Sequence, residues 1–312
     1  MAGSRIVSLG HYQPERILTN DELATMMETS DEWIRSRVGI RTRHIAAKDE
    51  ALDEMAAHAA RNALANGGVE AAAVDYVVLA TCTAIDRSPN IAARIAHRLG
   101  IPSPAVIDIN VACSGFTHAL ATADHAIRAG AATTALVIGA EKLSDFADWT
   151  DRTTAVLVGD GAGAAVLTAA DEPQIGPVLW GSVPEMSSAV RIEGVDGKFA
   201  QDGQSVFRWT IQSLPGIARD VCTRAGVDPA DLGAIVLHQA NLRIIEPLAE
   251  RIGAEKAVVA RDVVESGNTS AASIPIALSK LVARHEVPPG APVLLFGFGG
   301  GLAYAGQVVR CP

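Results

Sequence analysis

Two stretches of sequence, Ala60–Ala80 (ARNALANGGVEAAAVDYVVLA) and Ala218–His238 (ARDVCTRAGVDPADLGAIVLH), align without a gap when Gly68 is paired with Gly226. In each stretch a helical pattern stops at a glycine, a residue that often follows a helix end, and a short connection then leads into a continuous apolar strand. An alanine-rich chain can produce such a match by chance. The shared order of helix, Gly-Val and strand nevertheless favours a duplicated unit.

The rest of each half follows the same alternation of strands and helices. In the first half a strand at Ala105–Val111 leads into a helix near Ser114–Ala129, and another strand is expected at Thr154–Val158. In the second half a helix near Ala271–Ala283 precedes a strand at Val293–Phe296. Buried strands that alternate with helices predict mixed sheets covered on both faces.

The length of the chain fits this division into two halves. Its 312 residues are enough for two units of roughly 150 residues each. The stretch Asp171–Gly203 is rich in Gly and Pro, and we expect it to link the halves and to make surface excursions. The predicted halves are therefore residues 1–170 and residues 171–312.

Charge and cysteine content exclude several classes of protein. The net charge of −9 argues against a general nucleic-acid or anionic-membrane binder, and no apolar run reaches membrane length. We therefore expect a soluble, cytoplasmic protein. The four cysteines form no CxxC pair, so neither a metal site nor a disulfide framework is indicated. They are Cys82, Cys113, Cys222 and Cys311.

Cys113 is the first candidate for chemistry. It lies where the strand ending in Ile109-Asn110-Val111 meets the following helix. Backbone N–H groups and the positive end of the helix dipole at such a point favour a thiolate. A buried structural cysteine is the alternative interpretation.

His238 and Asn268 are the second and third candidates. His238 ends the apolar strand of the second half, and Asn268 precedes a helix in Ser266–Ser273 (SGNTSAAS). The alternatives are a hydrogen-bonded capping histidine and an N-cap asparagine. Because Asn268 opens a helix in one half as Cys113 does in the other, pseudo-symmetry would bring both helix starts toward one centre.

Glycine-rich stretches occur at two places. Phe296–Gly301 (FGFGGG) follows a buried strand, so its backbone N–H groups could form an oxyanion hole, although a tight turn explains it as well. Gly159–Gly163 (GDGAG) lies between two apparent strands and does not open a helix, which excludes a nucleotide-binding loop.

Six short motifs in a fixed order resemble β-ketoacyl-acyl-carrier-protein synthase III, the initiating condensing enzyme of fatty-acid synthesis, in the thiolase-like superfamily. They are Thr29–Ile34 (TSDEWI), Gly39–Arg41 (GIR), Ala112–Phe116 (ACSGF), Gly159–Ala164 (GDGAGA), His238–Arg243 (HQANLR) and Gly267–Ala272 (GNTSAA). The resemblance covers nearly the whole chain. It implies an α/β fold of five layers, αβαβα, with two duplicated halves and mixed sheets, and a homodimer.

The resemblance also implies a catalytic Cys113, His238 and Asn268. The Cys113 thiolate would attack an acyl-coenzyme A, with the N–H groups of Cys113 and Gly300 holding the oxyanion. Coenzyme A leaves and malonyl-acyl carrier protein enters. His238 and Asn268 would stabilise the enolate formed on decarboxylation, and this carbanion would attack the acyl-cysteine to give a β-ketoacyl thioester.

Binding residues follow from the same resemblance. Coenzyme A would contact Trp33, Arg37, Arg152, Gly203, Phe207 and Asn241, with Trp33 and Arg152 on either side of the adenine. The acidic carrier protein would dock on Arg208, Arg243 and Arg251, for which an ordinary solvated surface charge is the alternative. Further positive potential is expected from Arg35, Arg37, Arg41 and Arg43.

The acyl pocket departs from that of the acetyl-specific family members. Ser88 and Val158 stand where those members carry phenylalanine, and Gln201 stands at a methionine position. The phenylalanine at the position of Ser88 reaches across the dimer. Together with Phe298, these residues predict a pocket for an acyl chain larger than acetyl.

Two other functions remain open. A related acyltransferase could move the acyl group to an alcohol or amine of a secondary metabolite, and a non-catalytic thiolase-like scaffold could only bind acyl-coenzyme A. The sequence contains no papain-type cysteine signature, which argues against a cysteine hydrolase. No cofactor is expected, because acyl-coenzyme A would be a substrate.

Overall fold

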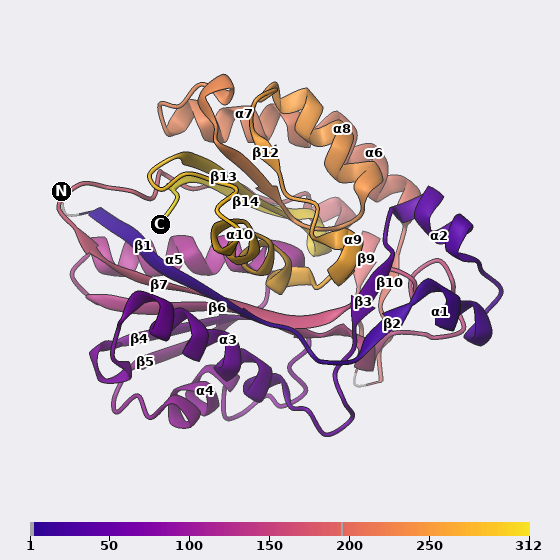
Figure 1. The fold of residues 1–312 in the computed structure, drawn as a ribbon, viewed down its shortest axis with the longest axis horizontal. Coiled ribbons are helices and arrows are strands. Elements are labelled where there is room, and N and C mark those ends of the chain that lie inside the picture. The colour runs from indigo at the N-terminus through magenta and orange to yellow at the C-terminus, as the bar shows by residue number, and fades with distance from the viewer. Residues whose placement is uncertain (1–2, 195) are drawn as a thin grey trace.

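Five layers of secondary structure are stacked as helix, sheet, helix, sheet and helix in this computed structural model, which describes residues 3–194 and 196–312 (Figure 1). The first sheet has the strand order β1-β7-β6-β4-β5. Its strands are β1 (Gly3–Tyr12), β4 (Tyr76–Ala80), β5 (Ala105–Ile109), β6 (Thr134–Lys142) and β7 (Asp160–Ala170). The second sheet has the order β12-β11-β13-β14-β8. Its strands are β8 (Leu179–Gly181), β11 (Ala234–Leu237), β12 (Val258–Val259), β13 (Pro292–Gly299) and β14 (Ala303–Arg310).

Two helices, α5 (Gly115–Arg128) and α10 (Ser273–Ala283), lie between the sheets and contact strands of both. The outer face of the first sheet is covered by α3 (Leu52–Gly67) and α4 (Ile91–Leu99). The outer side of the second sheet carries α6 (Gly203–Gln212), α7 (Leu214–Arg224) and α8 (Leu242–Ile252). The layer order predicted from the resemblance is therefore confirmed.

The two halves repeat one topology. Read from the edge, β1-β7-β6-β4-β5 corresponds strand by strand to β8-β14-β13-β11-β12, and α5 corresponds to α10. In both sheets the inner strands β4 and β11 are parallel to both neighbours. The helices before them end at Gly68 and Gly226, whose φ angles of 59° and 67° favour glycine. The sequence match thus reflects a structural duplication.

Smaller elements surround the two sheets. β2 (Ile17–Thr19) pairs with β3 (Thr42–His44), and β9 (Val190–Arg191) pairs with β10 (Ala200–Gln201). Short helices are α1 (Asn20–Met26), α2 (Asp31–Val38) and α9 (Val263–Ser266). The 3₁₀ turns are η1 (Ala71–Ala73), η2 (Ala112–Ser114), η3 (Leu143–Phe146), η4 (Pro184–Ala189), η5 (Pro229–Asp231), η6 (Ser270–Ala272) and η7 (Gly300–Leu302).

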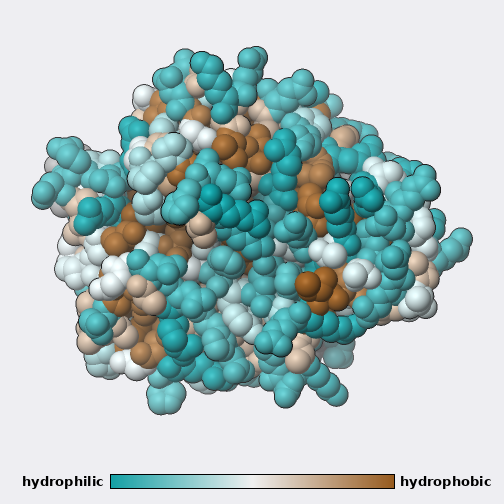
Figure 2. Space-filling model, in the orientation of Figure 1, coloured by the Kyte–Doolittle hydropathy of each residue, from teal (hydrophilic) through white to brown (hydrophobic). Residues whose placement is uncertain are grey.

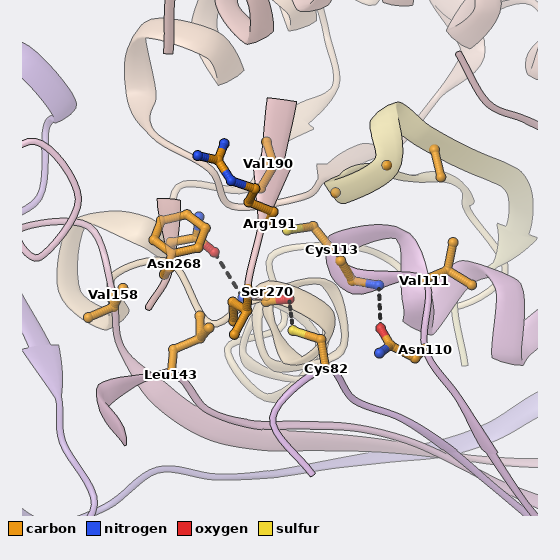
Figure 3. Close-up of a pocket in the computed structure, with 16 residues that line it drawn as sticks. Cys82, Asn110, Val111, Cys113, Leu143, Val158, Val190, Arg191, Asn268 and Ser270 are labelled. Carbon is orange, nitrogen blue, oxygen red and sulfur yellow. Dashed lines mark hydrogen bonds between the residues drawn. The ribbon is translucent and has the colours of Figure 1, made fainter. Parts of the chain in front are cut away.

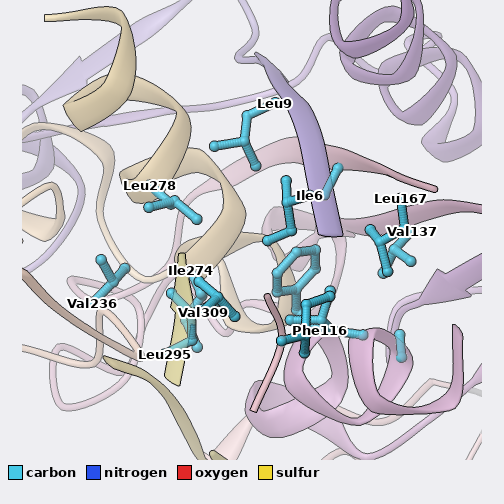
Figure 4. Packing of buried hydrophobic residues seen from close by; sticks show 14 of the residues in the cluster. Ile6, Leu9, Phe116, Val137, Leu167, Val236, Ile274, Leu278, Leu295 and Val309 are labelled. Carbon is cyan, nitrogen blue, oxygen red and sulfur yellow. The ribbon is translucent and has the colours of Figure 1, made fainter. Parts of the chain in front are cut away.

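The central core lies between the two sheets. Phe116 of α5 and Ile274 of α10 pack there against Ile6 of the first sheet and against Leu295 and Val309 of the second (Figure 4). All five side chains are at most 3% exposed. Because Phe116 and Ile274 are the second residues of α5 and α10, close packing fixes the starts of these two helices relative to each other.

Hydrophilic residues cover most of the face seen in Figure 2, and apolar side chains form separate groups. Among the described residues, no helix is both long and apolar enough to cross a membrane.

Three predicted segments differ from the structure. Thr154–Val158 is a buried turn rather than a strand, because only Val158 forms a bridge, with Asn268. The strand expected at Ala105–Val111 ends at Ile109, before the turn that carries the cysteine. The predicted linker contains β8, which pairs with β14 and so belongs to the second sheet.

Candidate functional site

Cys113 lies in a tight turn between β5 and α5. Ala112, directly before it, has a φ of 43°, which is unusual for a residue with a side chain and is tolerated only where the surroundings impose it. The turn η2 brings Cys113 to the wall of a cavity, and its side chain and backbone together are only 8% exposed. The strand–cysteine–helix arrangement expected from the sequence is present, with the helix starting at Gly115.

The glycine run after β13 packs directly on this cysteine. A Cβ atom on Gly299 would lie 2.8 Å from the Cys113 sulfur, and one on Gly300 would lie 2.7 Å from the Ala112 side chain. Only glycine therefore allows the backbone to approach so closely. Burial raises the pKa of the Cys113 thiol, and the nearby backbone of Gly300 lowers it in part. Close packing is therefore present in this run, and its role as an oxyanion hole stays a prediction.

His238 follows the end of β11 and is 2% exposed. Its Nδ1 lies 2.8 Å from the Ser273 hydroxyl, which also accepts a hydrogen bond from the backbone N–H of Gln239 at 3.2 Å. Burial lowers the pKa of His238 to about 3, an effect that a backbone hydrogen bond with Ser270 only partly offsets. His238 is therefore a neutral imidazole at physiological pH.

Asn268 is held by its backbone and by one side-chain atom. Its N–H donates to Leu157 O at 2.7 Å, and its carbonyl accepts from Gly159 N at 2.9 Å. The side-chain Oδ1 accepts from the Ser270 N–H at 2.9 Å. Since Oδ1 is engaged there, the Nδ2 group is the part of the amide left to face the cavity (Figure 3).

The expected stabilisation of the thiolate does not dominate at Cys113. Burial raises the pKa of the thiol, and hydrogen bonds from the Ser270 side chain and the Gly300 backbone lower it only in part. The charge of Glu141 raises it further. The prediction that the helix start favours a thiolate is therefore wrong for the free chain, because desolvation is the larger effect.

A cavity of about 380 Å³ brings Cys113 and Asn268 together. His238 is not part of its wall, but it contacts Ser270, which is. Residues that the sequence did not indicate also line it, among them Cys82, Leu143, Arg191, Ile192 and Phe199 (Figure 3). They come from four separate segments with no motif of their own, so no local signal could have identified them.

Of the four residues predicted to form the acyl pocket, one lines this cavity and three lie outside it. Val158 lines the cavity. Gln201 and Phe298 do not: Gln201 belongs to β10, and Phe298 packs edge-on against the His238 ring at 5.5 Å. Ser88 also lies outside this cavity, and its predicted role in the pocket of a partner subunit stays a prediction.

Three of the predicted coenzyme A residues take part in two cation–aromatic pairs near α2 and α6. The Arg152 guanidinium lies 5.0 Å from the centre of the Trp33 ring and donates to Glu28 O at 2.9 Å. The Arg243 guanidinium lies 6.0 Å from the Phe207 ring, which is 40% exposed. Trp33 and Arg152 were predicted to bind the same ligand, so their proximity was expected. The proximity of Phe207 to Arg243 was not expected, because these two residues were assigned to different ligands.

The remaining predicted binding residues are at helix ends or on exposed surface. Asn241 caps α8 through its Oδ1, which accepts from Ile244 N at 3.1 Å, and Gly203 is the first residue of α6. Arg251 donates to Ile211 O at 2.7 Å. Arg37 and Arg208 are exposed, on α2 and α6.

Arg43 corrects the expectation of a four-arginine surface cluster. It is fully buried and donates to the Val156 carbonyl and to the Asn20 side chain, both at 2.7 Å. Its guanidinium therefore holds the segment before Val158 in place instead of contributing surface potential.

Comparisons with known proteins agree on one family. The family described as 3-oxoacyl-[acyl-carrier-protein (ACP)] synthase III matches residues 107–184, and its C-terminal part matches residues 222–311. The chain is 71% identical to "Beta-ketoacyl-[acyl-carrier-protein] synthase III 4" of Streptomyces coelicolor, over 99% of both chains. It is 70% identical to the corresponding protein 2 of Streptomyces avermitilis, over the full length of both.

Solved structures support the same assignment. The crystal structure of the priming β-ketosynthase from the R1128 polyketide biosynthetic pathway has a TM-score of 0.97 and 40% identity, covering 99% of this chain and 96% of that one. The 3-oxoacyl-[acyl-carrier-protein] synthase III of Aquifex aeolicus has a TM-score of 0.93 and 38% identity, covering 99% and 100%. The chain is therefore a member of the β-ketoacyl-acyl-carrier-protein synthase III family, acyl-transferring condensing enzymes with the thiolase-like fold.

Proposed function

We propose that this protein transfers an acyl group larger than acetyl from coenzyme A to Cys113 and condenses it with malonyl-acyl carrier protein, with loss of CO₂. The observation that carries the proposal is the meeting of Cys113, Asn268 and the Gly300 backbone at one apolar cavity, with a neutral His238 directly behind Ser270. The family membership supports the same reaction.

The first half-reaction is acyl transfer to the cysteine. The Cys113 sulfur attacks the thioester carbonyl, and the carbon–sulfur bond to coenzyme A breaks as the new thioester forms. The N–H groups of Cys113 and Gly300 are the donors for the oxyanion. Because these are backbone groups in a packed turn, they are already oriented when the charge develops, which is the condition for strong electrostatic stabilisation.

The second half-reaction is decarboxylation and condensation. His238 and Asn268 donate hydrogen bonds to the thioester carbonyl of the malonyl group as CO₂ leaves, and the resulting carbanion attacks the acyl-cysteine. The Ser273 hydroxyl accepts a hydrogen bond from Gln239 N and so is free to donate its own hydrogen bond to His238 Nδ1, which leaves the proton of the neutral imidazole on Nε2. Neutral donors are suited to this step, since they stabilise the enolate without readily protonating it.

The walls of the cavity favour an extended or branched acyl chain. Leu143, Val158, Ile192 and Phe199 give it an apolar lining beyond the sulfur. A site of this kind gains binding free energy from each additional methylene that is removed from water, about 0.8 kcal/mol per CH₂. The sequence places Val158 where acetyl-specific members carry a phenylalanine, which supports the same conclusion.

Binding of the two substrates and of a second subunit completes the proposal. Trp33 and Arg152 would hold the adenine of coenzyme A, and the exposed residues Arg208, Arg243 and Arg251 would attract the acidic carrier protein. A homodimer is supported by the edge strand β5, whose residues are only partly buried and include Ile107 at 37% exposure.

The reaction is tested by supplying both substrates. The purified protein is incubated with a branched or medium-chain acyl-coenzyme A and malonyl-acyl carrier protein, and the carrier-bound product mass and CO₂ release are followed. A β-ketoacyl product formed with one CO₂ per turnover is expected. Asn268→Ala should release much less CO₂ while it still transfers the acyl group to Cys113. Acyl transfer without any CO₂ would contradict condensation, and a strict preference for acetyl would contradict the larger starter.

A further inference from the structure

The turns that precede the two central helices are held in the same way. Ala112 in η2 and Ser270 in η6 have φ angles of 43° and 44°, a conformation that is unfavourable for a residue with a side chain. Asn110 Oδ1 accepts a hydrogen bond from the Ala112 N–H at 3.4 Å, and Asn268 Oδ1 accepts from the Ser270 N–H at 2.9 Å (Figure 3). An asparagine oxygen that binds the N–H two residues further on stabilises a turn of this kind.

This arrangement is part of the duplicated unit. The alignment that pairs Gly68 with Gly226 has a constant spacing along the chain. The same spacing pairs Asn110 with Asn268, and it also pairs the first residues of α5 and α10. Asn110 is therefore the residue of the first half that corresponds to Asn268, and the nucleophile Cys113 lies three positions after it. Both asparagines line the same cavity, one from each half (Figure 3).

The turn of the first half presents the nucleophile. Cys113 follows Ala112 directly, so the backbone conformation of Ala112 sets where the sulfur and the Cys113 N–H lie. The fit leaves little space, because a Cβ atom on Gly299 would lie 2.8 Å from the sulfur and one on Gly300 would lie 2.7 Å from the Ala112 side chain. A change of φ at Ala112 would therefore move Cys113 relative to the Gly300 backbone, a proposed donor to the oxyanion.

We propose that Asn110 is a positioning residue, which holds Ala112 at its positive φ and thereby keeps Cys113 in place for acyl transfer. The inference rests on the proposed acyl-cysteine function. Without the Asn110 oxygen the Ala112 N–H loses this acceptor, and alanine by itself favours a negative φ. The turn then populates other conformations, in which the sulfur and the two backbone donors are not aligned for attack on a thioester.

Two features of this turn separate the role of Asn110 from a general effect on folding. Asn110 is exposed, so its replacement by alanine creates no cavity in the core. Ala112 is the residue with the unfavourable φ, and glycine adopts a positive φ about as readily as a negative one. In an Ala112→Gly background the turn should therefore depend much less on the Asn110 side chain.

The experiment measures the rate of Cys113 acylation against acyl-coenzyme A concentration, read from intact mass, in the wild type, Asn110→Ala, Ala112→Gly and the double variant. Asn110→Ala should lower the limiting rate about tenfold, with the half-saturating concentration within about twofold of the wild type. In the Ala112→Gly background the same replacement should change the limiting rate by less than about twofold. Asn110→Ser keeps a weaker side-chain acceptor and should lie between Asn110→Ala and the wild type. If Asn110→Ala does not fold, Asn110→Ser in both backgrounds gives the decision.

Alkylation by iodoacetamide, followed by peptide mass, reports the position of the Cys113 sulfur without coenzyme A. Burial raises the pKa of this thiol, so a sulfur that leaves the packed turn becomes more accessible and more acidic. Alkylation of Cys113 should therefore be faster in Asn110→Ala although acylation is slower, and it should not change when Asn110 is replaced in the Ala112→Gly background. Cys222 and Cys311, which are 0% and 4% exposed, should stay unreactive, because the change is confined to the turn.

Asn62→Ala is the matched control and should keep both wild-type rates. Asn62 is also an exposed asparagine, and its Nδ2 donates to His11 O at 3.0 Å. Wild-type acylation in Asn110→Ala would overturn the inference, and so would a raised half-saturating concentration with an unchanged limiting rate. A loss that persists in the Ala112→Gly background, as a weakened subunit contact at β5 would cause, would overturn it as well. Absence of any acyl adduct on the wild type, with the alkylation rates as expected, would contradict the proposed function and leave the role of Asn110 in the turn standing.

Discussion

Replacement of His238 by glutamine should make the folded chain less sensitive to mild acid. In the folded protein burial lowers the pKa of His238 to about 3, whereas in the unfolded chain it returns to the ordinary value of 6.5. Between these two values the unfolded chain binds a proton that the folded chain does not. The stability contributed by the neutral, buried ring is therefore complete above about pH 7.5 and is lost progressively as the pH falls below 6.5.

The size of the effect follows from the two pKa values. At pH 5 the unfolded-state pKa of 6.5 lies 1.5 units above the pH, and each unit corresponds to about 1.4 kcal/mol. The wild type should therefore lose about 2 kcal/mol of unfolding free energy through His238 between pH 7.5 and pH 5. His238→Gln has no titrating group there and should lose about 2 kcal/mol less over the same interval. Its absolute stability at pH 7.5 will differ for packing reasons and does not enter the comparison.

Urea denaturation at the two pH values measures this difference. Other groups that titrate in this range, such as His11 and His118, contribute equally to both proteins and cancel. His97→Gln, at an exposed position of α4, is the matched control and should keep the wild-type dependence. Equal losses of stability in the wild type and His238→Gln would refute the neutral, desolvated state of the ring, and with it the assignment of His238 as a neutral donor.

Further predictions concern the cavity and the substrates. Val158→Phe should narrow the cavity and disfavour long acyl chains by about 1–3 kcal/mol, roughly 5- to 150-fold in relative loading, while acetyl is retained; competition between two acyl-coenzymes A measures it, and unchanged selectivity would contradict the pocket assignment. Trp33→Ala should raise KM for acyl-coenzyme A about tenfold with little change in kcat, through loss of stacking; a change in kcat alone would contradict adenine binding there. Gly299→Ala should slow acylation of Cys113 about 100-fold, because its methyl group would lie 2.8 Å from the sulfur; wild-type acylation kinetics would show that this close approach is not required.

The architecture could be predicted from the sequence because the two duplicated halves keep a similar pattern of residues. The helix–Gly–Val–strand pattern around Gly68 and Gly226 occurs in corresponding elements of two sheets with corresponding strand orders. The same pattern indicated that Cys113 and Asn268 would approach each other, since each precedes a helix of the central layer. Local patterns are sufficient for such features, because each one is specified by residues close together in the chain.

Features that depend on long-range packing could not be read in this way. Arginine is usually found on the surface, yet Arg43 is buried. Its guanidinium donates a hydrogen bond to the carbonyl of Val156, more than a hundred positions away. Thr154–Val158 is apolar enough for a strand, but it forms a turn whose end pairs with the backbone of Asn268, more than a hundred positions away. The thiolate at Cys113 was expected from the helix dipole alone, because burial and the charge of Glu141 are properties of the assembled cavity.

The most direct test of the account is the intact mass of the protein after incubation with acyl-coenzymes A from acetyl to dodecanoyl, including branched chains, beside Cys113→Ala. The account predicts a single acyl adduct on the wild type, largest for a chain longer than acetyl, and none on Cys113→Ala. An adduct that persists in Cys113→Ala, or no adduct with any acyl group, would contradict the assignment of Cys113 as the nucleophile of this enzyme.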